Sequence, residues 1–113
     1  MARFEAATSI DGQRARVAMS GECDLSSREE CTATLMAAVG AAPAVVVDLS
    51  ALTFLDSSGV HALVTAHRAA LAKGGRLSVV NPSGMVAHVL DLTGVGELLQ
   101  PSRAGKAPEA GDG

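Results

Sequence analysis

Apolar and polar residues alternate near the start of the chain in a way that is typical of a β-hairpin. The arginines at 14 and 16 point away from a face formed by Ala15, Val17 and Met19. The dipeptide Asp11-Gly12 suits the positive φ values of a tight turn. Residues 3–20 are therefore predicted to form two paired strands, one of them at the edge of a sheet.

Helical spacing follows this hairpin. Ser27 and Glu30 match a capping box, so we expect a helix to start at Ser27, and Gly40 is placed to end it in the left-handed conformation. The apolar positions expected on its core face are Cys31, Leu35, Ala38 and Val39.

Three consecutive valines mark the next strand, Ala44–Leu49. Val45, Val46 and Val47 show no polar alternation, which indicates a central strand covered on both faces. A second helix is predicted from about Ser58 to Lys73, stopped by Gly74-Gly75. Its apolar positions are Val60, Leu63, Val64, His67 and Leu71.

The remaining pattern predicts a strand over Arg76–Val80 and a third helix that starts at 81–83 and ends at Gly94. In that helix Val86, Val89 and Leu90 share a face. The apolar piece Glu97–Gln100 fits either an edge strand or a segment that simply packs on the core.

The order β-β-α-β-α-β-α predicts an α/β fold, a mixed and mostly parallel sheet of four to five strands with about three to four helices. At 113 residues the chain is the size of one domain, which we place at residues 1–100. Residues 101–113 have no large apolar side chain and are expected to form a disordered tail.

Composition excludes several classes of function. Nine basic and twelve acidic residues give a net charge of -3, and aromatic residues make up only 2%, so nucleic acid is not an expected partner. No signal peptide or membrane-spanning run is evident, which favours a cytoplasmic protein. Cys23 and Cys31 fit no disulfide framework or zinc site, so we interpret them as small buried hydrophobes, and no cofactor or metal is expected.

The candidate chemistry lies in the serine pair after the valine-rich strand, Asp56-Ser57-Ser58-Gly59. Because the apolar helical period starts at Val60, Ser58 is predicted to cap the helix. Ser57 is then expected one residue outside the helix, where an attached phosphate would meet the positive end of the helix dipole. The loops that carry Asp24 and Asp56 are expected to emerge at the same edge of the sheet, where both residues would oppose that phosphate with like charge. Asp24 equally suits capping its own helix with Ser26.

Several segments together resemble the STAS domain, and specifically the stand-alone anti-sigma factor antagonists of bacteria. They are GECD at 21–24, VVVDLS at 45–50, FLDSSG at 54–59, GGRLSVVNPS at 74–83 and VLDLTGVGELL at 89–99. The resemblance implies phosphorylation of Ser57, with Ser58 as second choice. It implies a partner-binding surface that contains Asp24, Asp56, Ser58, Gly59 and His61.

The resemblance also implies a mechanism and partners. The unphosphorylated protein would bind an anti-sigma factor that is also its serine kinase, phosphorylation would end the binding, and a PP2C-type phosphatase would restore it. The protein would be a substrate, not an enzyme, acting in transcription regulation and stress response as a monomer or weak dimer. The alternative is a STAS scaffold or ligand-sensing module without regulatory phosphorylation.

Two residues depart from the family pattern. His61 stands where many members have a small residue, and it fits a solvated or interface histidine or a pH sensor. Cys23 replaces a commoner Leu or Ile in the loop.

Two other classes fit the residues poorly. A serine hydrolase would need a G-x-S-x-G elbow and an oriented histidine, neither of which is present. A receiver-like module phosphorylated on Asp48 would need a lysine after a later strand, and LSVVNPSG has none.

Overall fold

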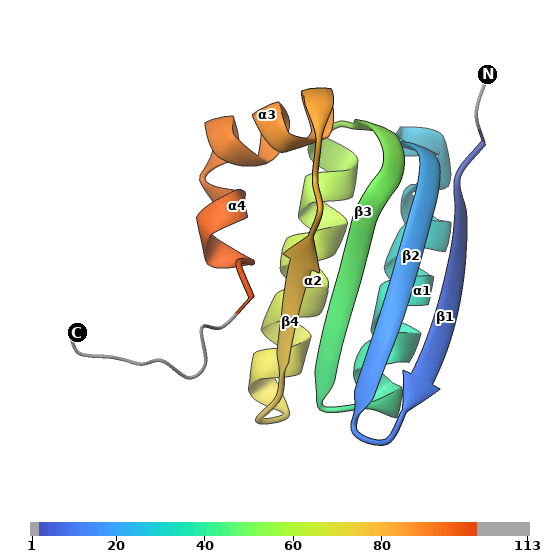
Figure 1. Cartoon of the computed structure of the whole chain (residues 1–113), viewed down its shortest axis with the longest axis vertical. Coiled ribbons are helices and arrows are strands. Elements are labelled where there is room, and N and C mark those ends of the chain that lie inside the picture. Colours follow the sequence, from blue (N-terminus) through green and yellow to red (C-terminus); the bar gives the residue numbers. More distant parts are fainter. Residues whose placement is uncertain (1–2, 102–113) are drawn as a thin grey trace.

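The computed structural model describes residues 3–101 and contains one four-stranded sheet. The strands are β1 (Glu5–Asp11), β2 (Arg14–Cys23), β3 (Ala44–Leu55) and β4 (Arg76–Val80), in that spatial order. β1 pairs antiparallel with β2, while β2, β3 and β4 are parallel to one another (Figure 1). The predicted mixed α/β sheet is confirmed, and Gly12 has the positive φ of 65° expected for the hairpin turn.

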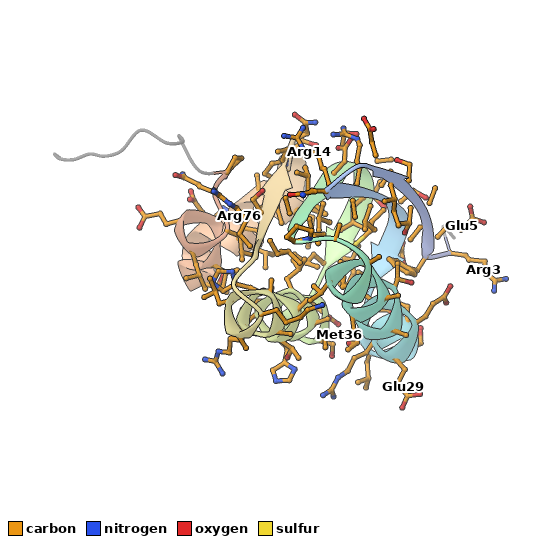
Figure 2. The ribbon with its side chains drawn as sticks, turned by 90° about the horizontal axis from the view of Figure 1, so that it is seen from below. Arg3, Glu5, Arg14, Glu29, Met36 and Arg76 are labelled. Atoms are coloured by element: carbon orange, nitrogen blue, oxygen red, sulfur yellow. The ribbon has the colours of Figure 1, made fainter. Side chains whose placement is uncertain are left out.

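The two long helices lie on one face of the sheet. They are α1 (Arg28–Ala41) and α2 (Ser57–Ala72), and a short 3-10 turn at Leu25–Ser27 precedes α1. Figure 2 shows both helices on the same side, with Arg14 and Arg76 extending from the sheet on the other side. The shorter helices α3 (Gly84–Thr93) and α4 (Val95–Leu98) lie beyond the β4 edge (Figure 1).

The core forms between the sheet and these helices from aliphatic side chains. The predicted core residues of the first helix, Cys31, Leu35, Ala38 and Val39, are all buried. β3 is central as predicted, but the expectation that it is covered on both faces is wrong. Val45 and Val47 are buried while Val46 is only half-buried, because α1 and α2 cover one face of the sheet.

Three predicted details of the helices are also wrong. Ser27 makes no side-chain cap of α1, so the capping box with Glu30 does not form. Gly40 lies inside α1, because the backbone N–H of Ala42 continues the helical ladder to Ala38 and the chain turns only at Pro43. Leu71 is 55% exposed, since the buried side of α2 consists largely of small residues.

The end of the described chain packs on the sheet without forming a strand. Gly94 ends α3 with a φ of 76°, as predicted. The single turn α4 follows, and the buried Leu99 then accepts a hydrogen bond from the backbone N–H of Val79 at 2.8 Å. The packing alternative for Glu97–Gln100 is thus the correct one.

No helix within residues 3–101 is long and apolar enough to cross a membrane. The predicted disordered tail at 101–113 falls, apart from Pro101, outside the described residues.

Candidate functional site

The candidate site lies where β2 and β3 end side by side. Cys23 is paired with Leu55, and the backbone N–H of Asp56 donates to the carbonyl of Cys23 at 3.2 Å. Asp24 and Asp56 therefore follow directly after adjacent parallel strands, and both turns emerge at one edge of the sheet as the sequence predicts.

Asp56, and not Ser58, caps α2. Its Oδ1 accepts hydrogen bonds from the backbone N–H of Ser58 at 2.9 Å and of Gly59 at 3.3 Å. The helix begins one residue earlier than predicted, so Ser57 is its first residue and does not lie outside it. A carboxylate is as good an N-cap as a hydroxyl, and the spacing of the apolar residues does not distinguish Asp56 from Ser58 as the capping residue.

The two serines differ in exposure. Ser57 is exposed and Ser58 is half-buried, and neither hydroxyl forms a hydrogen bond with a residue of the described chain. The backbone N–H groups of Ser58 and Gly59, at the positive end of the helix dipole, are already bonded to Asp56. The serine hydroxyl itself is left open to a partner.

Asp24 caps the turn before α1, which confirms the local-capping alternative. Its Oδ1 accepts from the Ser26 hydroxyl at 2.7 Å and from the backbone N–H groups of Ser26 at 3.0 Å and Ser27 at 3.3 Å. The hydrogen bond from the Ser26 hydroxyl, more than those from the backbone, holds the pKa of Asp24 below its usual value. Asp24 is thus kept as a carboxylate close to the serine turn.

Gly59 is required by space. A Cβ at this position would lie 2.8 Å from the Cys23 sulfur and would also overlap the Leu55 side chain. The first turn of α2 can approach the end of β2 this closely only because the residue has no side chain.

Cys23 and Cys31 are both fully buried beneath this turn, as expected for small hydrophobes. A hydrogen bond from the Cys31 thiol lowers the pKa of Cys23, and the same interaction, together with burial, raises the pKa of Cys31. The cysteine that departs from the family pattern is thus a packing residue in contact with the site.

His61 lies on the first turn of α2 and is exposed, as predicted. The sequence interpretation missed Leu25, which directly follows Asp24 and is 69% exposed. A large apolar residue between a capping aspartate and two serines was the available signal. Leu25, Ser57 and His61 give this edge an exposed apolar, hydroxyl and imidazole group.

The amino-terminal segment borders the same edge. Arg3 and Phe4 line a depression of about 400 Å³ together with Glu22, Asp24 and Ser26. Gly21, with a φ of 83°, permits this approach, because a Cβ there would overlap the Arg3 carbonyl.

Other chemistry finds no support among the described residues. Residues 3–101 contain no group of three or more His, Cys, Asp or Glu side chains arranged to hold a metal ion. Asp48, considered above as a receiver-type acceptor, accepts from the backbone N–H of Ser50 at 2.9 Å and forms an ion pair with Arg16 at 2.6 Å. The Ser50 hydrogen bond, assisted by Asn81 and Arg16, lowers the pKa of Asp48 to about 2.

Comparison with known sequences points to one family. Residues 6–100 match the family described as Mlab, STAS domain. The anti-sigma F factor antagonist of Lysinibacillus sphaericus is 32% identical over 82 residues, which cover 71% of this chain and 70% of that protein. Low affinity sulfate transporter 3 of Stylosanthes hamata is 41% identical over 54 residues, but these span only 8% of the transporter.

Solved structures agree with this match. An anti-sigma factor antagonist from Mycobacterium paratuberculosis superposes with a TM-score of 0.78 at 26% identity, covering 90% of this chain and 89% of that one. The anti-sigma factor antagonist SpoIIAA has been solved in two forms, each 25% identical and covering 90% of this chain. The unphosphorylated form gives a TM-score of 0.73 over 90% of its own chain, and the phosphorylated form of the Bacillus protein gives 0.66 over 94%.

Proposed function

Because this chain belongs to the STAS domain family, we propose that it is an anti-sigma factor antagonist controlled by phosphorylation of Ser57. In its unphosphorylated form it binds an anti-sigma factor that is also a serine kinase. Phosphorylation of Ser57 ends this binding, and a PP2C-type phosphatase restores it. The protein itself is then a substrate and a ligand, acting in the cytoplasm in transcription regulation and stress response.

The proposal rests on the different roles of Asp56 and Ser57 at the start of α2. Asp56 caps the helix, so the exposed Ser57 hydroxyl has no structural task among the described residues. Ser58 is less accessible and is the second choice for the acceptor. That SpoIIAA has been solved in phosphorylated and unphosphorylated forms supports the same chemistry in a relative.

Charge supplies the release. A phosphate adds about -1.5 to -2 charges at neutral pH next to Asp56 and near Asp24. Asp56 already occupies the helix N–H groups of Ser58 and Gly59, so they are not free to offset this charge. Weakening a complex 100-fold requires about 2.7 kcal/mol, which one desolvated like-charge contact can supply.

The partner is expected on the exposed side of this edge. We assign its contacts to Asp24, Asp56, Ser58 and His61, and add the exposed Leu25; Gly59 is buried and shapes this surface from beneath. Leu25 provides exposed apolar area beside the charged turn. Protein interfaces typically combine an apolar centre with a polar rim.

The experiment combines intact-mass spectrometry with binding. The full chain is incubated with ATP and each candidate anti-sigma kinase from the source organism, and a gain of about 80 Da is expected for one phosphate. Ser57→Ala should abolish the gain and keep binding at the level of the unmodified protein, while Ser57→Asp should bind about 100-fold more weakly. Ser9→Ala, an exposed serine on β1, is the matched control and should behave as the wild type.

Modification that persists in Ser57→Ala and disappears in Ser58→Ala would move the acceptor to Ser58. Equal affinity of Ser57→Ala and Ser57→Asp for the partner would contradict control by phosphorylation.

A further inference from the structure

A second concave site lies at the opposite end of the sheet from Ser57. A cavity of about 570 Å³ is bounded by the hairpin turn, the first residues of β3 and β4, the second half of α2 and the chain after α4. This volume falls within the range of small-molecule sites. None of the residues assigned above to phosphorylation or partner binding lines it.

Two leucines form an apolar side of this cavity. Leu71 on α2 is 55% exposed and Leu98 on α4 is 51% exposed. Leu71 is the residue that the helical pattern of α2 predicted to be buried. A ligand with an aliphatic portion would remove both side chains from water.

The polar side of the cavity is basic. Arg76 lines it together with Gln13 and Gln100, and none of the described residues that line it carries a carboxylate. Arg76 forms no ion pair within residues 3–101, in contrast to Arg16, which is paired with Asp48 on the same sheet. A planar guanidinium without an acidic neighbour in the cavity is suited to a carboxylate.

His67 provides an independent observation. Its ring lines the cavity, while its Nδ1 is shielded from solvent and has no hydrogen-bond partner in the described structure. Native structures rarely leave a buried polar atom unpaired without a reason. His67 therefore places an imidazole ring on the wall of the cavity, next to the polar groups described above.

We propose that this cavity binds an amphipathic monocarboxylate of medium chain length, with its carboxylate at Arg76 and its aliphatic chain along Leu71 and Leu98. Gln13, Gln100 and His67 contribute hydrogen bonds at the polar end. The site is independent of the proposed phosphorylation of Ser57, since it shares no residue with that edge.

Decanoate is the probe, titrated into the full chain well below its micelle concentration and followed by backbone amide NMR and calorimetry. We expect saturable binding with a Kd below about 1 mM, and shifts concentrated on residues 71–77. Octanoate should bind about fourfold more weakly, as expected for two methylenes that are half removed from water.

The variants separate charge from apolar contact. Arg76→Gln should weaken decanoate binding at least tenfold, and Leu98→Gln at least fivefold. Both residues are exposed, so the fold should be retained, which circular dichroism checks. Arg28→Gln, an exposed arginine at the start of α1, should leave the affinity unchanged.

Decyltrimethylammonium, which has the same chain and the opposite charge, should not bind. The proposal is overturned if decanoate shows no saturable binding below about 1 mM, if Arg76→Gln binds it as the wild type does, or if the ammonium probe binds equally well.

Discussion

The two ends of the parallel strands differ in charge because of how the helices are connected. α1 and α2 both begin at the carboxyl end, where Asp56 accepts from the first backbone N–H groups of α2 and Asp24 accepts from those of the 3-10 turn that leads into α1. Both helices end at the amino end, where the Lys73 amine donates to the Val39 carbonyl at 2.9 Å, and Arg76 follows. Acidic groups are thus placed at the positive ends of the helix dipoles and a basic group at a negative end.

One topology therefore produces two chemically distinct surfaces. At the carboxyl end the carboxylates are engaged in capping and leave a serine hydroxyl free. At the amino end Lys73 is engaged, and Arg76 is left without an ion-pair partner among the described residues. Each end therefore combines a structural charge with an unused functional group.

The largest expected effect tests the tight packing at the carboxyl end. Gly59→Ala should lower the free energy of unfolding by about 2 kcal/mol, because the new Cβ would overlap Leu55 and approach the Cys23 sulfur. Gly40→Ala, in the last turn of α1 at the opposite end of the molecule, is the matched control. Its Cβ meets no atom within 4 Å, so this change should stabilise the protein by about 0.8 kcal/mol in urea unfolding. Equal effects of the two substitutions would contradict the difference in packing.

The next effect concerns the cap of α2. Asp56→Ala should lower the free energy of unfolding by about 1 kcal/mol, because two backbone N–H groups lose their acceptor. Ser58→Ala, at the residue that the sequence favoured as the cap, should change it by less than about 0.5 kcal/mol. A larger loss in Ser58→Ala than in Asp56→Ala, measured by urea unfolding, would restore the sequence-based assignment.

The Lys73 amine at the amino end should contribute less to the free energy of unfolding than Asp56 does. Lys73→Met keeps much of the aliphatic stem and removes the amine that donates to Val39, so a loss of about 0.5 kcal/mol is expected. The loss should shrink in high salt if charge is its source. A salt-independent loss of the same size as that of Asp56→Ala would show that the two ends are equivalent.

Acid should produce the most gradual change. Asp48 has a folded-state pKa of about 2 against an ordinary value of 3.8, and the Asp24 pKa is also lowered. The unfolded chain therefore takes up protons first as the pH falls. The stabilisation is complete above about pH 4 and is lost on the way to pH 2. The melting temperature measured as a function of pH should therefore fall over this range, and Asp48→Asn should make the fall smaller. An unchanged dependence on pH in Asp48→Asn would rule out Asp48 as its source.

Much of the fold follows from the spacing of apolar residues and from the glycines that end strands and helices. The bounds of β4, the turn at Gly12 and the end of α3 at Gly94 were predicted because glycine and strand-forming residues leave little choice there. The placement of Asp24 and Asp56 at one edge followed from parallel pairing alone.

Two kinds of detail could not be predicted. One is the exact residue at which a helix begins, and the other is which side chains the neighbouring elements cover in the folded protein. Asp56 and Ser58 are both good N-caps, and only the position of the backbone selects between them. Val46 is apolar enough for a buried face, yet the helices cover the other side of the sheet. Leu71 has the right spacing for the core, but small residues complete the buried face of α2 without it.

The passage of Arg3 over Gly21 has a practical consequence for binding assays. Because Arg3 and Phe4 share a depression with Asp24 and Ser26, a dye, bead or fusion attached ahead of Arg3 would be held beside the surface where the partner is expected. Pro101, by contrast, lies beside Val79 and Val80 of β4 and lines no part of that depression. Immobilisation through the carboxyl-terminal side is therefore the orientation in which the affinities predicted above should be measured.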